Sequence, residues 1–224
     1  MHHPRRTLII TAVFTLGLTG TLTAQWVRQS PLPYQPLDAE SVTFATPTHG
    51  YIAGSDIAMG AATFADDFLL ETQDGGLTWA PRHFPGIQQN ILDVFFVDAL
   101  HGWVVGNPND NFRTVDGGLT WQAMSLSPDT TGTVNFLNPN FGWARGFNGG
   151  IRISSDGGAT WAFQSLSVGS IRSTDFFDPQ LGIGFSGTAI WKTTDGGASW
   201  TQVLAGDFMY SPKFLSASVL VVGV

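Results

Sequence analysis

Four copies of one turn decide the fold of this chain: TQDGGLTW (72–79), TVDGGLTW (114–121), SSDGGATW (154–161) and TTDGGASW (193–200). The aspartates of successive copies are 42, 40 and 39 residues apart. A steady period of this size indicates a repeat architecture in which each unit is one small group of secondary-structure elements. Asp-Gly-Gly readily adopts the positive φ angles of a tight hairpin turn. Each copy is therefore predicted to join two β-strands.

A second repeated element lies upstream of each turn. It reads SVTFATPTHGYIAG (41–54), DVFFVDALHGWVVG (93–106), TVNFLNPNFGWARG (133–146) and TDFFDPQLGIGFSG (174–187). In this alignment strand A of each unit ends near Phe44, Phe96, Phe136 or Phe177. Strand B starts at the glycine that follows, strand C runs into the turn, and strand D starts at the tryptophan. We predict an all-β fold, a β-propeller with four-stranded antiparallel blades of about 40 residues.

The composition agrees with many short strands that share a packed core. Of the 224 residues, 27 are glycine, 12 are proline and 43% are hydrophobic, including eight tryptophans and seventeen phenylalanines. The formal net charge is −7, and a negatively charged surface repels phosphate backbones, so we expect no nucleic-acid partner. With no cysteine, disulfides and thiolate metal sites are excluded.

The first residues have the layout of a secretory signal peptide. Arg5 and Arg6 precede an apolar run over 8–18, and small and polar residues follow up to Ala24. The run is too short to span a bilayer as a helix, although a retained membrane anchor is the alternative. We predict a signal peptide over 1–24, with no membrane span after its removal and with export to the periplasm, the cell surface or the extracellular space.

The repeated turn resembles the Asp-box, or BNR, repeat, whose pattern is Ser/Thr-x-Asp-x-Gly-x-Thr-Trp/Phe. With the GWVVG and GWARG elements, residues 25–224 are similar to the photosystem II stability/assembly factor family. The resemblance implies a binding or assembly scaffold that is not an enzyme and needs no cofactor. It also implies a structural role for the box residues, which are Thr72, Asp74, Gly76, Thr78 and Trp79; Thr114, Asp116, Gly118, Thr120 and Trp121; Ser154, Asp156, Gly158, Thr160 and Trp161; and Thr193, Asp195, Gly197, Ser199 and Trp200.

The two ends of residues 25–224 bear on ring closure. Residues 25–30 (QWVRQS) are similar to a strand D, which in many propellers completes the last blade. Residues 213–224 are similar to the first strands of a fifth unit. We therefore expect four full blades, a partial fifth and an incomplete ring belonging to a longer protein. A small five-bladed ring is the alternative.

A ligand would be expected on the face that carries the B-to-C and D-to-A loops, because the Asp-box turns occupy the other face. Unit one has a long insertion there, residues 55–68. With the corresponding loop of unit two it forms a possible ligand-face patch, which could also be an ordinary solvated insertion. The patch residues are Asp56, Asp66, Asp67, Asn107 and Asp110.

No metal site is predicted. The acidic loop lacks the Asp-x-Asp-x-Asp pattern of a calcium loop. His49 and His101 share one repeat position, but Phe141 and Leu181 occupy it in the other units. Histidine at this position is therefore interpreted as structural.

The main alternative function is a secreted glycoside hydrolase of the sialidase-like type. Such a site needs an arginine cluster, a tyrosine nucleophile and a glutamate partner. Glu40 and Glu71 are the only glutamates, and six arginines follow the leader without assembling such a triad. The sequence favours an unidentified protein or glycan partner over a substrate.

Overall fold

The structure is a computed structural model that describes residues 10–16, 22–28, 37–56, 68–82, 91–108, 110–126, 131–146, 150–164, 171–206 and 210–223. Over these residues the chain is all-β, with four four-stranded antiparallel sheets and two two-stranded hairpins. Each four-stranded sheet keeps its strands in chain order. The predicted propeller blades, four complete and one partial, are confirmed.

The strands fall into blades as follows. Blade one contains β3 (Leu37–Phe44), β4 (Gly50–Asp56), β5 (Phe68–Thr72) and β6 (Ala80–Arg82), and blade two contains β7 (Ile91–Phe96), β8 (Gly102–Gly106), β9 (Phe112–Thr114) and β10 (Gln122–Ala123). Blade three contains β11 (Thr131–Phe136), β12 (Gly142–Gly146), β13 (Ile151–Ser154) and β14 (Ala162–Gln164). Blade four contains β15 (Ser173–Phe176), β16 (Gly182–Phe185), β17 (Ala189–Thr193) and β18 (Thr201–Ala205). The hairpins are β1 (Ile10–Leu16) with β2 (Leu22–Arg28), and β19 (Tyr210–Ser216) with β20 (Val219–Gly223).

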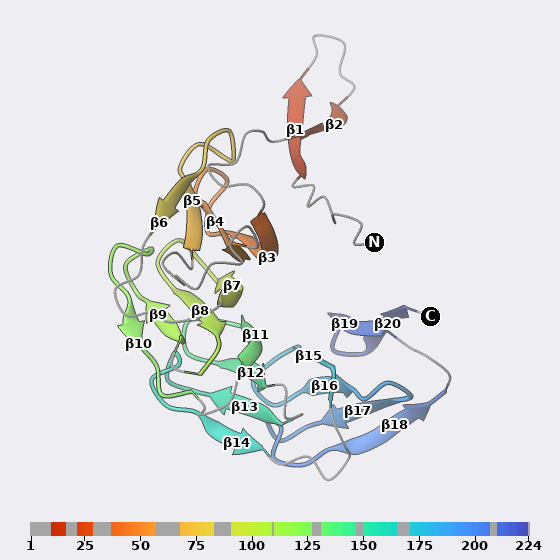
Figure 1. Ribbon diagram of the computed structural model, residues 1–224. Helices are drawn as coiled ribbons and strands as arrows, with labels where there is room; N and C mark the ends of the chain where they lie inside the picture. The colour runs from red at the N-terminus through yellow and green to blue at the C-terminus, as the bar shows by residue number, and fades with distance from the viewer. Residues whose placement is uncertain are drawn as a thin grey trace, which may run out of the picture.

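The blades follow one another along an arc (Figure 1). The first strand of each blade (β3, β7, β11, β15) lies on the inner side of the arc, and the last strand (β6, β10, β14, β18) lies on the outer side. The hairpin β19–β20 lies beside β15 and β16, where the first strands of a fifth blade belong. Each sheet therefore packs face to face with the next one along the chain.

The strand register corrects one prediction. Strand β15 ends at Phe176, which pairs with Gly182 just as Phe44 pairs with Gly50. Phe176 is 3% exposed and Phe177 is 41% exposed, so aligning Phe177 with the other phenylalanines was wrong by one residue. The physical reason is close packing: a Cβ on Gly182 would lie 2.6 Å from the Phe176 ring. The glycine opposite the phenylalanine therefore fixes the register.

Aromatic side chains form the core between blades. The residue after the first glycine of strand B, which we call the interblade residue, is Tyr51, Trp103, Trp143 or Ile183. Tyr51 stacks on Phe96 with ring centroids 4.8 Å apart, and Trp103 stacks on Phe136 at 3.4 Å. The Asp-box tryptophan of the later blade meets the same phenylalanine edge-on, as Trp121 does with Phe96. Each interface therefore repeats a three-ring arrangement that buries apolar area between sheets.

Hydrogen bonds between blades accompany this packing. The Tyr51 hydroxyl donates to the Gly117 carbonyl oxygen at 2.9 Å, and Trp103 Nε1 donates to the Gly157 carbonyl oxygen at 3.0 Å. Near the inner strands, the Val134 amide donates to Asp93 Oδ2 at 2.9 Å. The interface residues of one blade thus contact the Asp-box turn of the next.

The N-terminal hairpin involves residues from two predicted segments. Strand β2 pairs with β1 from Leu22 opposite Leu16 to Arg28 opposite Ile10. Residues 25–28, predicted as part of a closing strand, are thus paired with residues of the predicted leader, while residues 29–30 lie outside the described part of the chain.

Candidate functional site

Each Asp-box carboxylate is held by hydrogen bonds within its own turn. In blade two, Asp116 Oδ1 accepts from the Thr114 hydroxyl at 2.7 Å and the Thr120 amide at 2.9 Å. Asp116 Oδ2 accepts from the Thr120 hydroxyl at 2.6 Å. Asp74, Asp156 and Asp195 make the same three contacts in their own turns.

The first hydroxyl of the box holds the glycine pair. Thr114 Oγ1 is buried and accepts from the Gly118 amide at 2.9 Å, so the hydroxyl joins both sides of the turn. Gly117 and Gly118 have φ angles of +72° and +87°, which glycine adopts at low cost. The Gly117 amide donates to the Leu100 carbonyl oxygen at 2.9 Å, which joins the turn to the A-to-B loop of the same blade.

These hydrogen bonds keep the carboxylates ionised. The Thr120 hydroxyl, then the Thr120 amide and the Thr114 hydroxyl, lower the pKa of Asp116 to about 2. Asp74 and Asp195 have pKa values lowered to about 2 by equivalent bonds, and the pKa of Asp156 is also lowered. Catalysis of proton transfer near neutral pH favours a group whose pKa lies near the working pH. The arrangement therefore suits a turn-stabilising carboxylate and does not suit a general acid.

Removing one hydroxyl tests this electrostatic account. Thr120→Ala deletes the 2.6 Å bond to Asp116 Oδ2 and retains the backbone bond, so the pKa of Asp116 is expected to rise toward its ordinary value. A lowered pKa stabilises the fold above the ordinary value, and this stabilisation is lost as the pH falls toward 2. NMR titration of the carboxyl carbons measures the shift, with Asp195 as the internal control. An unchanged Asp116 titration would contradict the role assigned to the hydroxyl.

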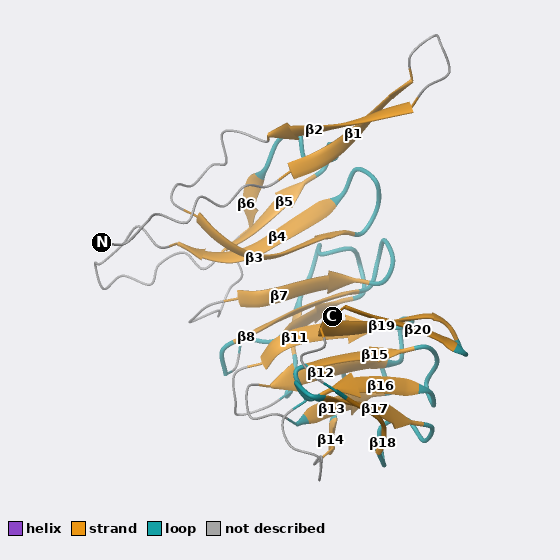
Figure 2. Ribbon diagram, turned by 90° about the vertical axis from the view of Figure 1, so that its right-hand side faces the viewer, coloured by secondary structure: helices purple, strands orange, loops and turns teal. Residues whose placement is uncertain are grey.

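The four carboxylates do not converge on one cavity. Each belongs to a different blade, and the A-to-B loops and Asp-box turns lie together along one side of the sheets (Figure 2). Within the described residues, no group of three or more histidine, aspartate or glutamate side chains could hold a metal ion.

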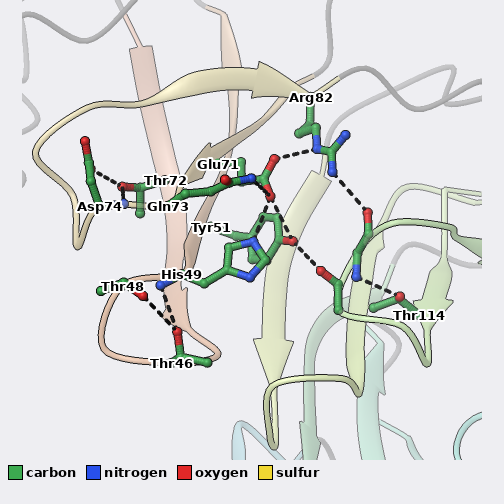
Figure 3. Close-up of polar contacts among 12 residues, drawn as sticks. Thr46, Thr48, His49, Tyr51, Glu71, Thr72, Gln73, Asp74, Arg82 and Thr114 are labelled. Atoms are coloured by element: carbon green, nitrogen blue, oxygen red, sulfur yellow. Dashed lines mark hydrogen bonds and ion pairs between the residues drawn. The ribbon is translucent and has the colours of Figure 1, made fainter.

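An ionic cluster around the buried Glu71, which sequence reasoning missed, joins blades one and two (Figure 3). Glu71 is 8% exposed, with His49 Nε2 2.7 Å from Oε1 and Arg82 Nε 2.6 Å from Oε2. Arg82 also reaches the Gly118 carbonyl oxygen at 3.5 Å. In blade two Arg113 occupies the repeat position of Glu71 and donates to the Gly157 carbonyl oxygen at 3.2 Å. Arg113 therefore contacts the neighbouring Asp-box turn directly, whereas Glu71 is linked to it through Arg82.

The cluster brings together a tyrosine, a glutamate and an arginine, the residue types of a sialidase-like site. Its environment opposes that chemistry, because Tyr51 is fully buried and its hydroxyl donates to a backbone carbonyl. Burial, and then the negative charge of Glu71, raise the pKa of Tyr51 well above its usual range. An activated nucleophile needs the opposite shift or an adjacent base with access to substrate. The cluster is therefore an interblade contact.

The two histidines of the shared repeat position have separate partners. His49 contacts Glu71, and His101 Nδ1 lies 2.9 Å from Asp98 Oδ2 within its own A-to-B loop. The structure does not bring them together.

Comparisons with known proteins agree with the blade architecture. The family model described as photosynthesis system II assembly factor YCF48 matches residues 85–133, which contain blade two. The photosystem II assembly lipoprotein Ycf48 of Synechococcus sp. (strain CC9902) is 26% identical over 133 residues, which is 56% of this chain and 37% of that protein. The chain is an Asp-box propeller that is similar to photosystem II assembly factors.

Solved structures show the same fold as this Asp-box propeller. The structure of YCF48 from Cyanidioschyzon merolae has a TM-score of 0.61 at 24% identity, covering 83% of this chain and 62% of that one. A structure described as YCF48 bound to D1 peptide has a TM-score of 0.58 at 22% identity, with 82% and 62% covered. This chain therefore spans less than two thirds of the length of these similar proteins.

On the predicted ligand face of the propeller, the patch residues are only partly described. Asp56 ends β4, but its side chain, like Asp66 and Asp67, lies outside the described residues. Asn107 follows β8, and its carbonyl oxygen accepts from the Asp110 amide at 2.9 Å. Asp110 is 1% exposed, so its carboxylate is turned into the protein. In the part of the propeller that can be described, no helix has the length and apolar character needed to cross a membrane.

A second cation that sequence reasoning missed lies between blades three and four. Arg145 is two residues after Trp143 on β12, and both pair regularly with β13, so the two side chains share one face. Trp143 packs against Phe176 of blade four on that face. In blades one and two the position of Arg145 holds Ala53 and Val105. This contrast between repeats could have identified Arg145 from the sequence.

Proposed function

We propose that this chain is a non-enzymatic scaffold that binds an extended segment of a partner protein during assembly. The support comes from the matches to assembly factors and from one similar protein described as bound to D1 peptide. We also propose that residues 1–24 direct export, in keeping with a relative described as a lipoprotein. A protein partner is favoured over a glycan.

The observation that carries the proposal is the environment of Arg145. Its side chain is half-buried, and burial lowers the pKa of the guanidinium. Within the described residues it has no hydrogen bond or ion pair with another side chain or the backbone. Removing a cation from water is costly unless a counter-charge compensates. A carboxylate supplied by a bound peptide would provide that compensation.

Arg145 lies at the end of the blades opposite the Asp-box turns. Gly142, at the start of β12, pairs with Ser154, the first residue of the Asp-box, whereas Arg145 pairs with Ile151 at the far end of β13. Arg145 is thus on the predicted ligand face. A planar guanidinium there could hold a carboxylate through two parallel hydrogen bonds.

The test uses a fluorescently labelled D1 peptide and measures binding by anisotropy. Arg145→Ala is expected to weaken binding by about ten- to a hundredfold, because a hydrogen bond to a charged group contributes about 1.5 to 3 kcal/mol. Alanine already occupies this position in blade one as Ala53, so the variant is expected to fold. Lys192→Ala, which removes an exposed cation beside the Asp-box of blade four, is the control and is expected to change binding little.

Three results would overturn the proposal, and two of them do not involve the control variant. One is equal peptide affinity for wild type and Arg145→Ala, and the other is no measurable binding by the folded wild-type chain. An equal loss in Arg145→Ala and Lys192→Ala would also contradict it, because general charge attraction would then explain the binding.

A further inference from the structure

Large apolar side chains are exposed on the Asp-box side of blade two. Val115 and Leu119 flank the glycine pair of the Asp-box turn, and Leu100 lies in the A-to-B loop. These side chains are 55%, 76% and 54% exposed, respectively. Gly117 N donates to Leu100 O at 2.9 Å, so the two loops are in direct contact. We call Leu100, Val115 and Leu119 the blade-two rim.

The repeat itself shows that the turn does not require these residues. Blade three has Asn140, Ser155 and Ala159 at the same positions. Its turn makes the same hydrogen bonds, including Gly157 N to Asn140 O at 2.8 Å and Thr160 N to Asp156 Oδ1 at 2.9 Å. Blade four has Gln180, Thr194 and Ala198 there. The apolar residues of blade two are therefore not explained by the fold, and clustered exposed apolar side chains mark interaction surfaces.

The charges around the rim indicate the kind of partner. Asp98 and Asp116 lie in the same two loops, and Asp74 lies in the neighbouring turn of blade one, where Leu77 is 70% exposed. No lysine or arginine occurs in residues 72–79, 97–101 or 114–120, and Arg82, which reaches the Gly118 carbonyl oxygen of this turn, is paired with Glu71. Apolar side chains bordered by carboxylates complement a segment that has apolar residues along one face and cations beside them.

We propose that the blade-two rim is a second docking surface, which binds a basic amphipathic segment of a partner protein. It lies at the end of the blades opposite Arg145, so it is independent of the peptide site proposed above. Leucine-type side chains of the partner would cover Leu100, Val115 and Leu119, and its lysines or arginines would face Asp98 and Asp116. The Asp-box turn would thus serve both to close the hairpin and to present this surface.

The test grafts the blade-three rim onto blade two: Leu100→Asn, Val115→Ser and Leu119→Ala in one chain. The graft is expected to fold, because blade three forms the same turn with these residues. The probe is a synthetic helical peptide with leucine on one face and lysine on the other, and its binding is measured by anisotropy. The graft is expected to bind the probe at least about tenfold more weakly than wild type, and Arg145→Ala is expected to bind it as wild type does.

Control peptides separate the possible outcomes. Replacing the lysines of the probe by glutamate, or its leucines by serine, is expected to abolish binding to wild type. Equal binding of the probe by wild type and graft would overturn the proposal, as would tight binding of the glutamate peptide. Sedimentation velocity tests whether the chain self-associates through the rim. If wild type self-associates and the graft does not, the rim binds a second copy of this chain, and the proposal is overturned.

Discussion

Replacing Trp103 by alanine is expected to lower the free energy of unfolding by about 3 to 5 kcal/mol. Trp103 is 1% exposed and stacks on Phe136 across the interface between blades two and three. Its indole nitrogen also donates to the Gly157 carbonyl oxygen at 3.0 Å. The substitution removes the largest fully buried side chain of the described residues and one of the two hydrogen bonds to the Gly157 carbonyl oxygen, leaving the bond from Arg113. Urea unfolding followed by circular dichroism measures the change.

A pair of conservative variants separates packing from hydrogen bonding at this interface. Trp143 holds the same position one blade later, but its Nε1 has no hydrogen-bond partner among the residues that the structure describes. Trp103→Phe loses ring area and a hydrogen bond, whereas Trp143→Phe loses ring area alone. Trp103→Phe is therefore expected to be more destabilising by about 1 kcal/mol. Equal losses would show that the bond to Gly157 adds nothing to stability.

Gly118→Ala is expected to be destabilising by more than about 3 kcal/mol, whereas Gly197→Ala costs about 1 to 2 kcal/mol. Both glycines occupy the same Asp-box position, with φ angles of +87° and +91°, so the backbone penalty is shared. At Gly118 a Cβ would overlap the hydroxyl of Tyr51, which is buried and bonded to Gly117. At Gly197 the nearest atom to a Cβ is Ile153 Cδ1 at 3.6 Å, an ordinary contact.

The measurement is the difference between the two alanine variants in urea unfolding. A large difference would assign the extra cost to the contact between blades one and two. Equal effects would mean that only the left-handed backbone conformation matters, and the proposed contact between the blades would then not be rigid.

The fold could be predicted from the sequence because its decisive signals are local. Asp116, Gly118 and Trp121 lie within one turn, and the turn recurs at nearly constant spacing. The register of the fourth unit could not be predicted reliably, because Phe176 and Phe177 are adjacent and both are apolar. Only the packing of Phe176 across Gly182 distinguishes them.

The interblade contacts could not be predicted because they join residues far apart in sequence. Glu71 occupies a repeat position that holds Arg113 in blade two, so an alignment of the repeats shows no fixed residue type at this position. Its partners His49 and Arg82 become visible only when three strands are placed side by side. Arg145 differs in this respect, since its contrast with Ala53 and Val105 is present in the sequence.

The interblade hydrogen bonds also determine the order in which the blade interfaces can form during synthesis. In the two bonds made by interblade aromatic residues, the donor belongs to the earlier blade and the acceptor to the later one: Tyr51 and Gly117 are 66 residues apart, and Trp103 and Gly157 are 54 apart. Because translation proceeds from the N-terminus, a newly made blade leaves the ribosome with its aromatic residue uncovered until the following turn has been translated. The growing chain therefore has one exposed interblade aromatic surface at a time. Each added blade buries the aromatic residue of the previous blade and exposes its own.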